Sequence, residues 1–150
     1  MPQSLAKVLI HIVFSTKYRA PWLSTSILPD LHTYMAKVAR GTDCECFRAG
    51  GVADHVHLAV SLSRMVTIAN FVEEVKTSSS KWLKTQSPDL ESFAWQRGYA
   101  VFSVDPKGLV ALCKYIDNQA VHHRQHDYKP ECRKFLTSAG IVYDERYVWD

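Results

Sequence analysis

The chain has 150 residues, of which 47% are hydrophobic and 22% are charged. This composition indicates one globular domain with a sizeable core and excludes a disordered or fibrous chain. The net charge of +3 and the pI near 8.7 permit binding to nucleic acid without requiring it. The N-terminus lacks a signal-peptide pattern and no stretch is apolar enough to span a membrane, so we expect a cytoplasmic protein.

The first half of the chain predicts three strands and one helix. Residues 8–14 are largely apolar on both faces, which is typical of a central strand. Residues 27–40 have a helical pattern that Gly41 closes. Residues 44–52, CECFRAGGV, predict a second strand with a bulge or turn at Gly50 and Gly51. Residues 55–63, HVHLAVSLS, predict the third strand.

The second half predicts a helix over residues 67–84, a strand over 95–104, and helices over 109–124 and 130–139. The order β-α-β-β-α-β-α predicts an α+β fold of the ferredoxin-like or RRM-like type. In this fold an antiparallel sheet has helices packed on one face, and we expect it to form a single domain over residues 1–150. The tail at 143–150, YDERYVWD, could lie over a neighbour.

The four cysteines are Cys44, Cys46, Cys113 and Cys132. Their spacings match neither a disulfide framework nor a CxxC zinc pair. We therefore expect four reduced thiols, in keeping with a cytoplasmic location.

Two histidines raise the question of function. Because side chains alternate along a strand, Val56 and Leu58 point into the core, while His55 and His57 share the opposite, polar face. Their backbones are then roughly 6–7 Å apart, at ~3.3 Å of rise per residue. Two imidazoles at this spacing can converge on one metal ion. The pair by itself fits two solvated histidines on a sheet face equally well.

A second feature lies on the predicted helix over residues 109–124. Tyr115 and Gln119 are one turn apart and lie off the apolar stripe of this helix, with His122 close to them. This arrangement suits a nucleophile beside a metal ligand. The alternative is a tyrosine that packs at the domain boundary and an exposed glutamine.

Six segments in order along the chain resemble the HUH single-tyrosine transposases of the insertion-sequence two-hundred/six-hundred-five type. They are HIVFSTKYRAPWL, DHVHLAV, SSSKWL, FAWQRGYAVFSV, YIDNQAVHH and GIVYDERYVWD. The resemblance spans nearly the whole chain, and the segment DHVHLAV is similar to the histidine–hydrophobic–histidine motif of that family.

The resemblance implies that Tyr115 is the nucleophile and that His55, His57 and Gln119 hold a divalent metal. Such enzymes cut single-stranded DNA beside small hairpins at the ends of a mobile element, form a 5′-phosphotyrosine link and release a 3′-hydroxyl. They work as homodimers, often with the tyrosine helix completing the partner's site. The ligand types suit Mn²⁺, with Mg²⁺ as a substitute. No nucleotide cofactor is expected, because the phosphotyrosine ester keeps the bond energy and no GxxxxGK[ST] loop is present.

Basic residues at several places are candidates for DNA binding, although each also fits a solvated surface position. They are Lys17, Arg19, Lys76, Lys84, Arg97 and Arg124. Aromatic residues such as Tyr18, Trp22 or Trp95 could stack on unpaired bases.

Two other functions are compatible with parts of the sequence, and a third lacks its motif. One is a non-catalytic module of the same fold that binds single-stranded nucleic acid, although the aromatic motif of RNA-recognition domains is absent. Another is a domesticated relative that cuts repeat hairpins without moving an element. A third, a histidine phosphoesterase, would require two separate Hx[ST] motifs, and we find no such pair.

Overall fold

One antiparallel sheet organises the protein, which the computed structural model describes over residues 2–150. The strands lie in the order β2-β3-β1-β4. They are β1 (Leu9–Ser15), β2 (Glu45–Val52), β3 (His55–Ser61) and β4 (Ala100–Val104). The element order β-α-β-β-α-β confirms the predicted ferredoxin-like fold class, and the predicted central strand is β1.

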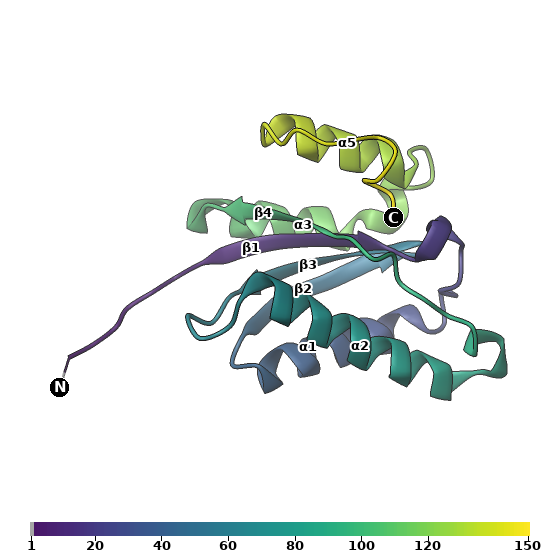
Figure 1. The fold of residues 1–150 in the computed structure, drawn as a ribbon, viewed down its shortest axis with the longest axis horizontal. Helices are drawn as coiled ribbons and strands as arrows, with labels where there is room; N and C mark the ends of the chain where they lie inside the picture. The colour runs from purple at the N-terminus through teal and green to yellow at the C-terminus, as the bar shows by residue number, and fades with distance from the viewer. Residues whose placement is uncertain (1) are drawn as a thin grey trace.

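The first helical layer packs under the sheet (Figure 1). It contains α1 (Leu28–Gly41) and α2 (Ile68–Gln86), close to their predicted ranges. Thr67 caps α2 by accepting a hydrogen bond from the backbone N–H of Asn70. Alternate residues of β1 and β3 form the core with these helices, among them Ile12, Phe14 and Leu58. This side of the molecule has the arrangement that the alternation of apolar residues predicts.

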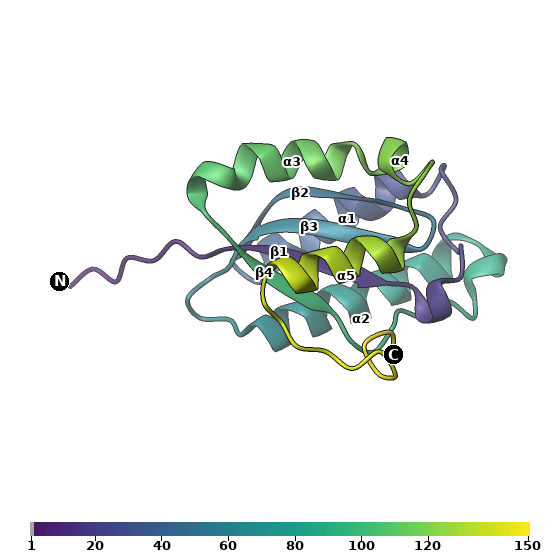
Figure 2. The same ribbon diagram turned by 90° about the horizontal axis from the view of Figure 1, so that it is seen from above.

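A second helical layer covers the other face of the sheet. It consists of α3 (Leu109–Asp117), α4 (Gln119–His122) and α5 (Tyr128–Ser138). Figure 2 shows α3 along the β2 edge and α5 across the side of β1 and β4. The prediction placed helices on one face only and left this second layer out. The upper face of β1 is apolar at Val13, which is buried against Tyr128, Cys132 and Leu136 of α5.

Three local features differ from the sequence-based expectation. The register of β2 shifts between Cys46 and Arg48, and not at the glycine pair. β4 starts at Ala100 and not at residue 95, and the carbonyls of residues 96–98 just before it accept hydrogen bonds from the ammonium of Lys76. The predicted single helix over residues 109–124 is interrupted at Asn118, whose backbone lies outside the helical region.

The C-terminal tail lies on its own chain. Trp149 is buried in the same cluster as Tyr128, and its carbonyl accepts a hydrogen bond of 2.7 Å from the guanidinium of Arg19. All four cysteines are free, as expected. Within residues 2–150 we find no helix with the length and apolar character needed to cross a membrane.

Gly50 sets the distance between β2 and α3. A Cβ atom at this position would lie 2.5 Å from Cγ2 of Ile116 and 2.9 Å from the Ile116 carbonyl oxygen. Gly50→Ala is therefore expected to push α3 outward and to lower the free energy of unfolding by about 1–3 kcal/mol, measured by urea denaturation. Gly41→Ala is the matched control, because nothing lies within 4 Å of the added atom. Equal stability of the two variants would contradict this account of the β2–α3 contact.

Candidate active site

The two histidines of β3 are buried under the second helical layer. His55 and His57 are both 0% exposed, which excludes the alternative of two solvated histidines on a sheet face. His11 of β1 lies beside His57 with the rings stacked at 5.1 Å. Because the two central strands carry these rings, the sheet holds the imidazoles in place.

Each β3 histidine is oriented by a partner on its Nδ1 side. Nδ1 of His55 lies 2.7 Å from a carboxylate oxygen of Asp54, and Nδ1 of His57 lies 2.8 Å from Nε2 of His11. Burial lowers the pKa of His11 to about 3, so His11 is neutral and its Nε2 can pair with Nδ1 of His57 through a hydrogen bond. Partners of this kind fix the ring orientation and leave Nε2 free to face a ligand.

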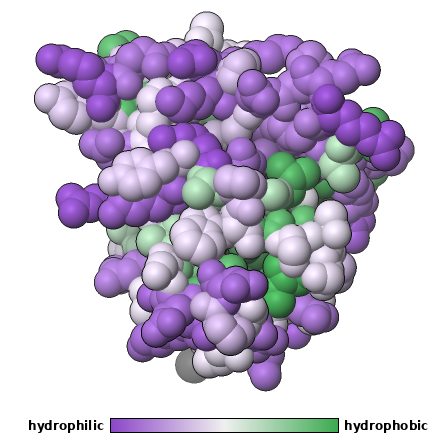
Figure 3. All heavy atoms as spheres, turned by 90° about the vertical axis from the view of Figure 1, so that its right-hand side faces the viewer, coloured by the Kyte–Doolittle hydropathy of each residue, from purple (hydrophilic) through white to green (hydrophobic). Residues whose placement is uncertain are grey.

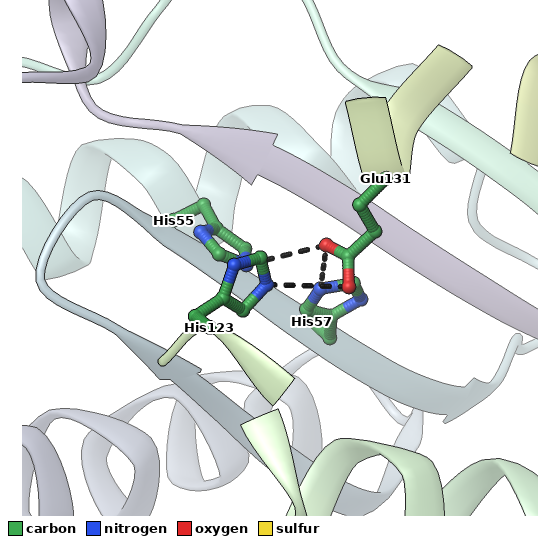
Figure 4. A group of neighbouring side chains, drawn as sticks. All are labelled: His55, His57, His123 and Glu131. Carbon is green, nitrogen blue, oxygen red and sulfur yellow. Dashed lines mark hydrogen bonds and ion pairs between the residues drawn. The ribbon is translucent and has the colours of Figure 1, made fainter. Parts of the chain in front are cut away.

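Glu131 of α5 is the group that both Nε2 atoms face (Figure 4). One carboxylate oxygen lies 3.4 Å from Nε2 of His55 and 3.1 Å from Nε2 of His57. The other lies 3.3 Å from Nε2 of His123, whose Nδ1 donates to the carbonyl of His126. One ligand atom from each of His55, His57, His123 and Glu131 lies within 4.8 Å of the others.

These four side chains are arranged to hold a metal ion. The set combines imidazole nitrogens, already oriented from behind, with a carboxylate, which is a donor set for a divalent ion. Although its burial acts the other way, hydrogen bonds with His123, His55 and His57 hold the pKa of Glu131 well below its usual range. An anionic carboxylate therefore lies at the centre of the cluster.

A metal ion bound at the cluster would replace a proton on His55. Burial lowers its pKa, but the hydrogen bonds with Asp54 and Glu131 outweigh that effect and raise the pKa to about 9. His55 is then protonated on both nitrogens at neutral pH, and Nε2 is 2.9 Å from the side-chain oxygen of Gln119. The Nε2 proton occupies the position at which a cation would bind. By contrast, burial lowers the pKa of His57 to about 4, so His57 is neutral.

Tyr115 and Gln119 reach the same carboxylate from the other side. The Tyr115 hydroxyl donates a hydrogen bond to Glu131, and Nε2 of Gln119 donates to the same oxygen at 3.2 Å. The interruption at Asn118 does not separate them. Burial, followed by the neighbouring Glu131 carboxylate, raises the pKa of Tyr115 above its ordinary value. The structure thus brings together all four residues that the sequence singled out for chemistry: Tyr115, His55, His57 and Gln119.

Four members of this cluster were not expected from the sequence: His11, Asp54, His123 and Glu131. Asp54 directly precedes the histidine pair, and His123 follows His122, so both are next to residues that the sequence already singled out. His11 stood out as a polar residue in an apolar strand. Glu131 had no signal, since it lies on another helix, 74 residues from its partner His57.

Five of the six basic candidates are distant in sequence from this cluster, while Arg124 directly follows its member His123, and the six have different surroundings. Lys76 is engaged with carbonyl oxygens and Arg19 with the C-terminal tail, so both hold the fold together. Lys84 and Arg97 line one hollow beside α2, while Lys17 and Arg97 line a second next to Tyr18. Arg124 is exposed just after α4. The end of the molecule shown in Figure 3 is mostly hydrophilic, with paler and apolar side chains gathered in the middle.

A family model described as "Transposase IS200 like" matches residues 4–119, which is most of the chain. The chain belongs to the IS200-like transposase family. This transposase is 25% identical over 114 residues to the ISDra2 transposase TnpA of Deinococcus radiodurans, a match that covers 73% of this chain and 81% of the relative. It is 27% identical, again over 114 residues, to the transposase for insertion sequence element IS200 of Salmonella typhimurium, which covers 73% and 74% of the two chains.

Solved structures have the same fold as this IS200-like transposase. One is a crystal structure from Deinococcus radiodurans described as a candidate transposase, with a TM-score of 0.61, 23% identity and coverage of 79% of this chain and 98% of that one. Another is a REP-associated tyrosine transposase bound to a REP hairpin, with a TM-score of 0.60, 17% identity and coverage of 82% and 73%. Since the family match ends at residue 119, His123 and Glu131 lie beyond it.

Proposed function

We propose that this transposase cuts and rejoins single-stranded DNA at hairpin-flanked ends of an element through a covalent bond to Tyr115. One observation carries the proposal: the Tyr115 hydroxyl is hydrogen-bonded to Glu131, a member of the histidine–carboxylate cluster of the same chain. A phenol beside a candidate metal site is the pairing that phosphodiester exchange needs. The relatives named as transposases support the same conclusion.

The metal ion in this proposal is Mg²⁺ or Mn²⁺. His55, His57 and Gln119 would hold it, and Glu131 and His123 are placed to complete the set. When bound, the ion would withdraw charge from the scissile phosphate and support the leaving oxygen. His11 and Asp54 keep the rings oriented, and the covering layer of α3 to α5 excludes water from the histidines.

The new bond forms on Tyr115. Its hydroxyl is held by a hydrogen bond to Glu131, and the phenolic proton would leave to water, because Glu131 is too weak a base to take it. The Tyr115 oxygen then bonds to phosphorus while the bond from phosphorus to the 3′-oxygen breaks, and that oxygen takes up a proton to become a 3′-hydroxyl. The ester keeps the bond energy, so the reverse reaction with another 3′-hydroxyl rejoins the strand without a nucleotide cofactor.

DNA would reach this centre from the basic parts of the surface. Lys84, Arg97 and Lys17 line neighbouring hollows, and both hollows include Trp95. The exposed ring of Tyr18 at the second hollow could stack on an unpaired base. Contacts to phosphates give affinity without sequence information, so replacing these side chains should weaken DNA binding in a salt-dependent way. Such a protein would act at DNA in the cytoplasm.

We propose that Tyr115 acts in the chain that carries it, in cis, because its hydroxyl is hydrogen-bonded to Glu131 of the same chain. A mixture of Tyr115→Phe and His57→Ala proteins is therefore expected to form no covalent adduct with a hairpin oligonucleotide, since each chain lacks one half of its own site. The mixture is incubated with Mn²⁺, denatured and separated by electrophoresis. An equal mixture of wild type and either variant is the control and retains adduct. Restored adduct in the doubly defective mixture would show that tyrosines act across chains.

The homodimer expected from the resemblance remains a proposal of its own. Trp149 of the tail is buried within its own chain, whereas Tyr147 of the tail, Val110 on α3 and Val121 on α4 are exposed and could lie at a contact between chains. Light scattering is expected to give twice the chain mass of 17.1 kDa. A monomer at micromolar concentration would contradict the dimer and leave the cis site untouched.

A further inference from the structure

A cavity beside Tyr115 lies between α3 and α5. It measures about 460 Å³ and is lined by residues of α3 and α5, together with His122 of α4. Its inner end is formed by Tyr115, His122 and Glu131, the groups closest to the proposed chemistry. Its volume falls in the usual range of about 300–1,000 Å³ for small-molecule sites.

The remaining walls of the cavity have two different characters. Ala111, Leu112 and the ring of Phe135 form an apolar wall. Phe135 is held in place by an edge contact with Tyr115 at 5.7 Å and by stacking on Phe102 at 5.5 Å. Lys134 and Ser138 form a polar rim on α5. Both are exposed, and Lys134 has no ion pair or hydrogen bond within residues 2–150.

The charges of the lining residues favour a neutral group inside the cavity and an anionic group at its rim. Lys134 at the rim is the one Lys or Arg side chain among the lining residues, so the apolar walls suit a neutral group inside the cavity better than a free phosphate. A flat, neutral aromatic group can stack on Phe135, while a phosphate that follows it can lie against the free ammonium of Lys134. An unpaired nucleobase of a DNA strand has this combination.

We propose that this cavity binds the base of the nucleotide whose 5′-phosphate becomes joined to Tyr115. The inference rests on the proposed function and adds the place on the protein at which one base of the strand is recognised. In an in-line displacement the leaving 3′-oxygen departs on the side opposite Tyr115, which directs the leaving nucleotide away from the α3–α5 cavity. The nucleotide that stays attached to Tyr115 is the one that can reach this cavity. Since Lys134, Phe135 and Ser138 lie beyond the family match, this selection belongs to the C-terminal part of the chain.

The test uses single-stranded oligonucleotides that carry the hairpins flanking the coding region, with a stable abasic analogue on either side of the cut. Loss of the base on the retained nucleotide is expected to slow adduct formation by wild type about tenfold, the scale of one lost stacking contact. Loss of the base on the leaving side should have no such effect. The Tyr115→Phe protein should show the same preference in its affinity for uncut DNA.

A pair of tryptophan substitutions on α5 tests the cavity from the protein side. Ser138→Trp places a ring in the cavity from its exposed rim. This variant should form the adduct with intact DNA more slowly than wild type does. Its rates with the intact and the abasic strand should be equal. Thr137→Trp, also exposed on α5 but outside the lining, should behave as wild type. Equal rates of wild type on intact and abasic strands would overturn the cavity proposal and leave the tyrosine mechanism standing. Absence of any adduct from wild type overturns the proposed function, and the cavity proposal with it.

Discussion

Tyr115→Phe is expected to form no covalent adduct with DNA while binding the hairpin as tightly as wild type. The change removes only the oxygen that would attack phosphorus, and the ring still packs against Phe135 and His57. The phenol is partly buried, so its loss leaves the fold in place. The measurement incubates the protein with a labelled hairpin oligonucleotide and Mn²⁺, denatures it and counts label on the protein band.

Tyr128→Phe is the matched control for this result. Tyr128 lies on α5 with its ring 4.7 Å from that of His55, but its hydroxyl makes no contact with Glu131. It should keep the adduct, and peptide mapping of wild type should place the label on Tyr115. Label on Tyr128, or adduct from Tyr115→Phe, would contradict the role given to α3. If no adduct forms on any hairpin, the protein is a nucleic-acid-binding module of the same fold.

His57→Ala is expected to lower adduct formation at least about a hundredfold and to abolish binding of Mn²⁺ measured by electron paramagnetic resonance. The ring lies at the centre of the cluster and is oriented by His11, so no other side chain takes its place. Affinity for the hairpin should change little, because the basic side chains lie elsewhere. His32→Ala, on α1 beneath the sheet, should retain both metal and activity. Equal cleavage by wild type and His57→Ala in Mn²⁺ would disprove the metal site.

The raised pKa of His55 gives metal binding a defined pH dependence. Since the pKa is about 9 without metal, binding at neutral pH must displace a proton from His55. The apparent affinity for Mn²⁺ should therefore rise with pH until about 9 and then level off. Calorimetry in buffers of different ionisation enthalpy detects the released proton. Affinity that does not change between pH 7 and pH 9 would exclude His55 as a ligand.

The sheet and its first helical layer follow from alternation and helical periodicity, which are local properties. β1 is apolar on both faces and is central, and the 27–40 pattern becomes α1 within one residue at each end. The exceptions come from contacts between distant residues. The carbonyls of residues 96 and 98, just before β4, bind Lys76 of α2, and no pattern within residues 95–104 encodes that contact.

The candidate site likewise has one part that local patterns predict and one part that depends on contacts between distant elements. The spacing of His55 and His57, and that of Tyr115 and Gln119, could be found because each pair belongs to one element. The position of Glu131 could not, because it depends on how α5 crosses the sheet. The same crossing explains why His55 and His57 are buried, since alternation assigns a face to a side chain but does not say what covers it.

A divalent ion at the cluster would act as a reversible cross-link. His57 and Glu131 are 74 positions apart in sequence, and they belong to the sheet and to the last helix. An ion bound to both would tie the C-terminal end of the chain to its interior and stabilise that attachment by the free energy of binding. Loading with metal would thus also decide how firmly the cover over the histidines is closed.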